Sequence, residues 1–256
     1  MSRSNQNELY NPSTKWFDWN GAGDGGFPEF YNKEKDNGEG KDPGGNVRVP
    51  IPFQFIVLDQ MSAIKGWNDA QKSGIFSNEV RNSKQTPMTV KFHKGGVVAQ
   101  GLYENIKAQV IAAGGKFTAN IYIAFKDETG KMAIGSIQLK GAGLKAWSEF
   151  SKKHRADIMK KAVVITGFQD GQKGAIKFRT PVFGLKEVKE ETNKAAIELD
   201  AILQAYLVPY CAKTASIEGQ AAAIPAEQAS APVVQEPAAA AEELIPDMVH
   251  PDDDPF

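Results

Sequence analysis

Residues 116–126, KFTANIYIAFK, alternate between apolar and more polar side chains with a period of two. Successive side chains of a β-strand point to opposite faces, so this period predicts a strand with one face in a core. The five positions expected to face inward are all apolar: Phe117, Ala119, Ile121, Ile123 and Phe125. The opposite face presents one aromatic ring, Tyr122, between Lys116 and Lys126. A chain built around such a strand must form a sheet that separates a core from a second face.

Further short segments from Val49 onward are rich in β-branched and aromatic residues and are separated by turn signals, as strands are. The predicted strands lie at residues 49–59, 73–80, 88–92, 116–125, 132–139, 162–168 and 175–183. DETG at 127–130 and DGQKG at 170–174 predict the tight turns that join the last two strand pairs as hairpins. The chain therefore predicts a mainly antiparallel β body.

Three helices are expected, at residues 102–113, 144–154 and 188–207. The first has Leu102, Ile106 and Val110 on one stripe and is followed by two glycines. A helix between two sets of strands in a small β protein is typical of the OB-fold, a partly open five-stranded barrel that binds nucleic-acid strands across one face. We therefore expect a mainly β, OB-fold-like, partly open antiparallel barrel with a few helices.

Both flanks differ in composition from the body, which is expected at residues 47–213. Residues 1–46 are rich in Gly, Asn and Asp but hold seven aromatic residues, so we expect an irregular arm that packs on or near the body. GAGDGG at 21–26 fits a dinucleotide-binding pattern, but no strand precedes it and no helix follows, so a turn is expected. The Ala, Pro, Gln and Glu after Lys213 predict a disordered acidic C-terminal tail, with a linker at 214–246 and a tip at 247–256.

The charges of the chain are divided between body and tail. Residues 214–256 hold nine Asp or Glu and no Lys or Arg, which leaves 30 basic and 22 acidic residues in 1–213. Between Lys65 and Lys186 there are 21 Lys or Arg against 8 Asp or Glu. A surplus of this kind predicts an anionic partner, although a solvated surface is the ordinary alternative.

Aromatic rings beside lysines on a polar strand face are the combination that stacks bases and pairs with phosphates. Tyr122 is the first stacking candidate, and Trp67, which shares its strand parity with Lys65, is the second. Phe76 and Trp147 are further candidates. Each ring has the alternative of being an ordinary core residue.

Phosphate contacts are expected from basic residues on the same outward faces. In TVKFHK, Lys91 and His93 fall on the outward side. In AIKFRTPVF the apolar residues at 176, 178 and 182 are expected to face inward, which directs Lys177 and Arg179 outward. The predicted phosphate-binding residues are Lys65, Lys91, Lys116, Lys126, Lys173, Lys177 and Arg179.

Catalytic and metal-binding patterns are absent from the sequence, which predicts a protein that is not an enzyme and needs no cofactor. The three histidines lack ligand spacing, and Cys211 is the only cysteine, so no metal is expected. A single thiol suits a reducing compartment, and the first twenty residues do not read as a secretory signal. We therefore expect a cytoplasmic protein with neither a membrane nor a small-molecule partner.

The last five residues, DDDPF, resemble the acidic tip of bacterial single-stranded DNA-binding proteins, although the apolar residue that usually precedes Pro255 is missing. The whole arrangement is more similar to phage-type single-stranded DNA-binding proteins, in which a basic OB-like body precedes an acidic tail. PFQFIVLDQMSAIKGWND, SGIFSNEV and GGKFTANIYIAF in the body resemble that phage family, over about half of the body.

This resemblance implies a protein that coats and protects single-stranded DNA, with little sequence preference, during phage DNA replication, recombination and repair. It also implies that the tip recruits partner enzymes, the ring of Phe256 entering an apolar pocket while carboxylates meet basic residues. The tip residues are Asp252, Asp253, Asp254, Pro255 and Phe256. Two alternatives stay open: a single-stranded RNA-binding protein, and a scaffold that does not bind nucleic acid and carries the tail for solubility.

Overall fold

The computed structural model of the protein describes residues 10–32 and 45–221, with side-chain placement as far as Lys213. The described part is 47% strand and contains three helices, which confirms the prediction of a mainly β protein. The strands are β1 (Lys15–Asn20), β2 (Phe27–Tyr31), β3 (Asn46–Arg48), β4 (Phe53–Asn68), β5 (Ser73–Ser77), β6 (Met88–Phe92), β7 (Val97–Gly101), β8 (Gly115–Lys126), β9 (Met132–Lys140), β10 (Ala162–Lys173) and β11 (Ile176–Lys186). The helices are α1 (Tyr103–Ala112), α2 (Gly141–Lys153) and α3 (Glu190–Ala221).

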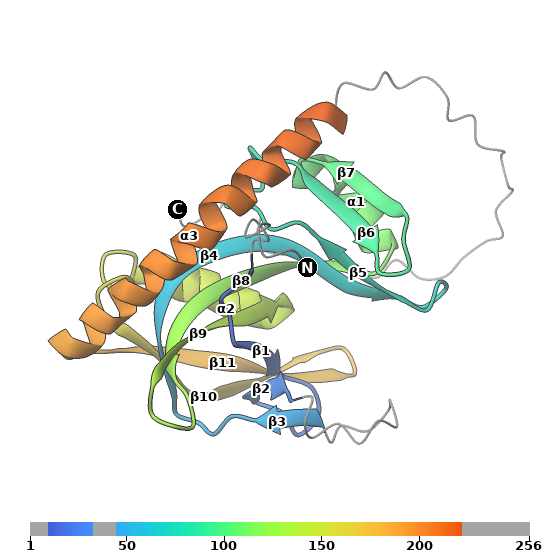
Figure 1. The fold of residues 1–256 in the computed structure, drawn as a ribbon. Coiled ribbons are helices and arrows are strands. Elements are labelled where there is room, and N and C mark those ends of the chain that lie inside the picture. Colours follow the sequence, from blue (N-terminus) through green and yellow to red (C-terminus); the bar gives the residue numbers. More distant parts are fainter. Residues whose placement is uncertain (1–9, 33–44, 222–256) are drawn as a thin grey trace, which may run out of the picture.

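The strands form one open, mixed sheet in the order β3-β2-β1-β9-β8-β4-β5-β6-β7. The hairpin β10–β11 branches from this sheet, because β10 pairs with the first residues of β4. In the described chain every strand pairing is antiparallel except that of β1 with β9, which is parallel. Figure 1 shows β4, β8 and β9 as long curved strands, with β5–β7 and α1 at one side of them and β1–β3 at another.

The first core lies on the inner side of this curved sheet and is covered by α2. Phe17 of β1, Phe55 of β4 and Ile165 of β10 meet there with Trp147 of α2. Of the five positions of β8 predicted to face inward, four lie in this core and the fifth, Phe117, packs in another core. The alternation in residues 116–126 therefore identified the inner face of β8 correctly.

The second core lies on the outer side of the same strands and is covered by α3. Tyr122 and Ala124 of β8 are packed there against Leu203 and Leu207 of the helix. The middle of β8 is buried on both faces for this reason. Figure 1 shows α3 running obliquely past β4.

The third core lies between α1 and the strands β5–β7. Ile64 of β4, Ile75 of β5 and Val90 of β6 pack there with Ile106 and Val110 of the helix. The predicted stripe of α1 thus faces this core. Ile64 lies on the same side of β4 as the first core. The third core therefore covers the inner side of β4, β5 and β6 and does not cover their outer side.

The N-terminal arm is more regular than the predicted irregular segment. Residues Lys15–Asn20 and Phe27–Tyr31 form the hairpin β1–β2, and Phe17 of β1 is directly paired with Ile137 of β9. The GAGDGG segment is the connection between the two strands, and it is tied to β11 by the bridge between Ala22 and Phe178. The aromatic residues of this Gly-rich segment do not alternate with polar residues at a period of two. The sequence pattern therefore did not predict these strands.

Several boundaries also differ from prediction, and the strand expected at 49–59 is β4, which begins at Phe53 and continues to Asn68. The turn predicted over 170–174 is shorter, because β10 continues to Lys173 and β11 begins at Ile176. Helix α3 continues to Ala221, beyond the expected start of the linker at 214. The rest of the predicted linker and the acidic tip lie outside the described residues. None of the helices in the described part combines the length and apolar character that a membrane crossing needs.

Candidate functional site

Four predicted binding residues form a single row across the strands β8, β4, β5 and β6. Lys116 lies directly opposite Lys65, Lys65 opposite Phe76, and Phe76 opposite Lys91. Directly opposed residues share a sheet face and have Cβ atoms only about 5 Å apart. The sheet therefore places three ammonium groups and one aromatic ring side by side.

A second row lies one step further along the strands on the same face. Trp67 is paired with Gly74, and the backbone N–H of His93 donates to the carbonyl of Gly74 at 2.9 Å. A Cβ atom at Gly74 would lie 2.5 Å from Cδ2 of His93, so only glycine leaves room for this imidazole. The rings of His93 and Phe76 are 4.6 Å apart at 34°.

We call these six residues the open face: Lys65, Trp67, Phe76, Lys91, His93 and Lys116. Trp67 is 54% exposed, and Lys91, His93 and Lys116 are exposed as well. Phe76 is half-buried. The aromatic and basic side chains of this face are thus accessible to a ligand that lies across several strands.

Lys65 is the least exposed of the three lysines in the row. Burial lowers the pKa of its ammonium group, and the charge of Lys140 acts in the same direction. The carboxylates of Glu79 and Asp18 oppose this change. Since Lys65 also lies directly opposite Lys116, its positive charge is poorly accommodated by the protein alone.

Glu79 forms a polar cluster between the open face and α3. Its two carboxylate oxygens accept hydrogen bonds from the amide of Asn120 at 2.6 Å and from the hydroxyl of Tyr122 at 2.8 Å. Its backbone N–H donates to the hydroxyl of Tyr210 at 2.9 Å, which connects α3 to the sheet. Glu79 keeps part of its surface exposed, but desolvation of the carboxylate still raises its pKa, against the effect of these two hydrogen bonds.

Tyr122, the first predicted stacking residue, is not accessible. The side chain has no exposed surface, because α3 covers this part of the outer face. Burial raises the pKa of the Tyr122 hydroxyl, and the neighbouring Glu79 adds to the change. The prediction of an open ring at Tyr122 is therefore wrong: the face was assigned correctly, but a helix from the end of the body occupies it.

Trp147 is also a core residue. It is 1% exposed and lies in the first core, on the inner side of α2. Its indole N–H donates to Oε1 of Gln60 at 2.7 Å. The prediction that Trp147 stacks a base is wrong for this structure, because the ring is buried among the side chains of the first core.

Lys126 is exposed but lies away from the open face. It is the last residue of β8, whereas Lys116 is the second, and the two are separated along the strand by the residues that α3 covers. Ten residues of strand span about 33 Å. The structure therefore does not bring Lys126 together with the other predicted phosphate contacts.

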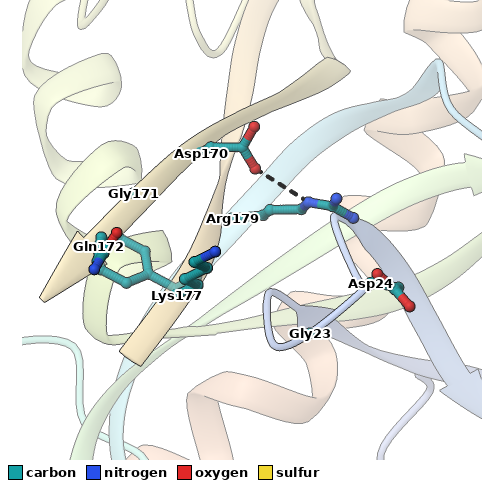
Figure 2. A pocket seen from close by; sticks show the side chains of 8 residues that line it. Gly23, Asp24, Asp170, Gly171, Gln172, Lys177 and Arg179 are labelled. Atoms are coloured by element: carbon teal, nitrogen blue, oxygen red, sulfur yellow. Dashed lines mark hydrogen bonds and ion pairs between the residues drawn. The ribbon is translucent and has the colours of Figure 1, made fainter. Parts of the chain in front are cut away.

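The hairpin β10–β11 carries the remaining predicted residues on a second surface. An open hollow of about 600 Å³ is lined there by the hairpin and by the turn that follows β1. Figure 2 shows Arg179 directed toward Asp170, with Asp24 of the turn nearby and the exposed Lys177 further along the strand. Lys173 is exposed at the tip, on the opposite face from Lys177.

Arg179 has a structural role in this hollow. Its guanidinium group donates to Asp170 at 3.2 Å and to the carbonyl of Gly25 at 2.5 Å, and it lies 4.4 Å from the ring of Phe168. Its backbone carbonyl accepts from the indole of Trp19 at 2.8 Å. These contacts fix the β1–β2 turn to β11, so the prediction of an Arg179 side chain open to phosphate is wrong.

The predicted facing of β11 is inverted. Ile176 and Val182 are 69% and 41% exposed, whereas Pro181 is buried and Phe183 packs against the first core. Val182 is apolar, which suggested an inward position. Its partner on β10 is Gly167, which has no side chain to cover that face of the hairpin. The residues of β11 that face inward are therefore the odd-numbered ones, and Lys177 belongs to the same face of the strand.

Sequence reasoning missed Glu79 and Tyr210. The segment SGIFSNEV was predicted as one strand, but β5 ends at Ser77, and Val80 instead forms an isolated bridge to Ser62. Because the chain leaves β5 and pairs with β4 at Val80, Glu79 lies beside the open face. No local sequence pattern predicts this change of pairing. Among the described residues, no three His, Cys, Asp or Glu side chains gather as metal ligands would.

Comparisons with known proteins identify no relative of this chain. No family model, no curated protein and no solved structure matches it.

Proposed function

We propose that this protein binds single-stranded DNA across the open face, without catalysis and with little sequence preference. The observation that carries this proposal is the row in which Lys116, Lys65, Phe76 and Lys91 lie side by side on four strands. Like charges directly opposite each other destabilise a sheet, and phosphate groups would relieve this repulsion. Flat rings beside the lysines supply stacking that does not depend on the base.

The connectivity of the body supports an OB-type barrel as the basis of this function. Strands β4, β8 and β9 form an antiparallel meander, α2 follows, and the hairpin β10–β11 returns to pair with β4. OB folds have this arrangement and bind oligonucleotides on the face of their second and third strands. Here β5–β7 and α1 are inserted between β4 and β8, and the open face extends onto this insertion.

Binding of oligo-dT at two salt concentrations tests the proposal. Phosphate contacts release counterions, so affinity should fall steeply as salt rises. Three contacts from Lys65, Lys91 and Lys116 correspond to a slope of about −2 in log K against log salt, at about −0.7 per contact on single strands. Fluorescence anisotropy of a labelled oligonucleotide gives both quantities, and absence of binding at low salt would refute the proposal.

Two comparisons address the alternatives. Oligo-rU measured beside oligo-dT distinguishes a preference for RNA, because the open face itself contains nothing selective for a 2′-hydroxyl. A scaffold that uses the sheet for protein contacts would bind neither oligonucleotide at either salt concentration. The triple variant Lys65→Gln, Lys91→Gln, Lys116→Gln should lose most binding while its melting temperature stays close to that of the parent protein.

Recruitment of replication, recombination or repair proteins by residues 247–256 is a second part of the proposal. These residues lie outside the described chain. The acidic residues followed by an aromatic side chain fit a basic pocket with an apolar floor. Deleting 247–256 should abolish partner capture and leave or increase affinity for oligo-dT. Reduced DNA affinity after the deletion would contradict this assignment.

A further inference from the structure

The outer side of β1 continues the sheet face on which the open face lies. Asp18 of β1 is paired with Gln138 of β9, which is paired with Asn120 of β8. Asn120 is opposite Met61 of β4, on the same side as Lys65. The register therefore leads in three steps, from β4 over β8 and β9 to β1, without a change of face.

Trp16 is the exposed aromatic residue at the far end of this path. It precedes Asp18 by two residues, so it shares its face, and 48% of its surface is exposed. Its neighbours Phe17 and Trp19 are engaged elsewhere, Phe17 in the first core and Trp19 with the carbonyl of Arg179. Tyr31 of β2 lies beside Trp16, one position beyond the Phe17–Phe30 pair, and is 58% exposed.

Charged groups lie along the path between the two ends. The pKa of the Lys65 ammonium group responds to Asp18 on β1 and to Lys140 on β9, so all three side chains lie within electrostatic reach. Lys140 is exposed and directly opposite Thr118, on the same face. A strand of nucleic acid that leaves the lysine row over Lys140 would meet Asp18 and Trp16 next.

We infer that Trp16, assisted by Tyr31, is a second base-stacking position for the same DNA strand that crosses the open face. The inference rests on the proposed function. The contact would be to bases and not to phosphates, because the exposed Asp18 beside Trp16 repels anions. The N-terminal arm would then be part of the binding surface as well as part of the sheet.

The separation of the two positions makes the inference testable by oligonucleotide length. Strands β4 and β1 are three sheet steps apart, which is about 14 Å. Trp16 is in register with Ser136, Tyr122 and Asp59, and Asp59 lies eight residues, or about 26 Å, along β4 from Trp67. Binding sites of OB folds extend from about 4 to about 16 nucleotides. An oligo-dT of about 4 nucleotides should occupy the open face alone, and one of about 16 should reach Trp16 as well.

The experiment compares Trp16→Ala with Trp67→Ala on these two oligonucleotides. Loss of one stacked base is worth about 1–3 kcal/mol, a factor of about 5 to 150 in affinity. Trp16→Ala should weaken binding of the longer oligonucleotide by this factor and leave the shorter one unchanged, whereas Trp67→Ala should weaken both. Trp16→Phe should restore binding of the longer oligonucleotide, and Ile197→Ala, at an exposed apolar residue of α3, is the matched control.

A second variant covers the case in which Trp16→Ala fails to fold. Asp18→Asn removes the negative charge beside Trp16 and should raise affinity for the longer oligonucleotide more than for the shorter one, because Asp18 also acts on the charge of Lys65. Unchanged binding of both variants, with Trp67→Ala still impaired, would overturn the inference and leave the proposed function intact. Equal losses on both oligonucleotides after Trp16→Ala would also overturn it. Failure of the parent protein to bind either oligonucleotide would instead refute the proposed function.

Discussion

The outer face of the central sheet consists of two halves that differ in what covers them. In one half, Tyr122 and Ala124 of β8 lie under α3 and form the second core. In the other half, Lys116 of β8 and Lys65 of β4 lie beside accessible aromatic rings. Both halves belong to the same strands and the same side of the sheet. Only the position of α3 distinguishes a surface that holds the protein together from one that can hold a ligand.

The polar cluster around Glu79 marks the border between the halves. Glu79 bonds to Tyr122 on the covered side through its carboxylate and to Tyr210 of α3 through its backbone. The same carboxylate acts on the charge of Lys65 on the open side. A change at this border should therefore affect both halves, whereas a change inside one half should affect that half alone.

Tyr122→Ala should produce the largest effect, and it should be on stability. Removing a buried aromatic ring costs about 3–5 kcal/mol. Equilibrium unfolding in urea measures this loss, and the affinity of the remaining folded protein for oligo-dT should be unchanged. A stable variant with weakened DNA binding would reverse the assignment of the two halves.

Trp67→Ala is the counterpart in the open half. We expect a loss of about 1–3 kcal/mol in binding free energy for oligo-dT, since one stacked base is lost. The free energy of unfolding should change by less than about 0.5 kcal/mol, as for other exposed positions. Comparable losses in stability and affinity would mean that Trp67 supports the sheet instead of presenting a ring to the ligand.

Glu79→Gln tests the border by its pH dependence, with a smaller effect. Burial raises the pKa of Glu79 above its ordinary value of 4.5, so the folded protein binds a proton there more tightly than the unfolded chain. The contribution of Glu79 to stability is then fully present below pH 4.5 and decreases as the pH rises through the raised pKa. The stability of the parent protein relative to Glu79→Gln should decrease over this range in urea titrations. An increase with pH would contradict the raised pKa.

Lys116→Gln and Lys126→Gln form the matched pair with the smallest expected effect. The two lysines lie at opposite ends of β8 on the same face, with the covered half between them. Lys116→Gln should reduce the salt slope of oligo-dT binding by about 0.7, the value for one phosphate contact. Lys126→Gln should leave the slope unchanged, and equal effects would extend the binding surface past α3.

The sequence predicted the inner face of the sheet better than its outer face. Period two assigned four residues of β8 to the first core, and the three helices begin close to where they were expected, although α3 continues beyond its predicted end. The same rule cannot tell whether the opposite face meets water or a helix, because α3 is more than sixty residues away from β8 in sequence. For that reason Tyr122 was assigned to the correct face but was wrongly predicted to be exposed.

Pairing across strands explains the other differences between prediction and structure. Lys65, Phe76 and Lys91 were selected one strand at a time, and only the register shows that they form a row. On β11, the apolar residues Ile176 and Val182 are exposed. Taking them as inward-facing assigned the wrong face of this strand to the core. The basic residues Lys177 and Arg179 were therefore assigned to a free surface, although Arg179 holds the arm in place.

The parallel pairing of β1 with β9 has a consequence for biosynthesis. Thr14, beside β1, bonds to the carbonyl of Ile134, which is 120 residues later in the chain. At about 5–20 residues per second, β1 leaves the ribosome roughly 6 to 24 seconds before its partner is made. During that interval its edge has no strand to pair with and is open to aberrant association. β1 therefore reaches its native place only after β9 has been made, and a chaperone that protects β1 would act in this interval.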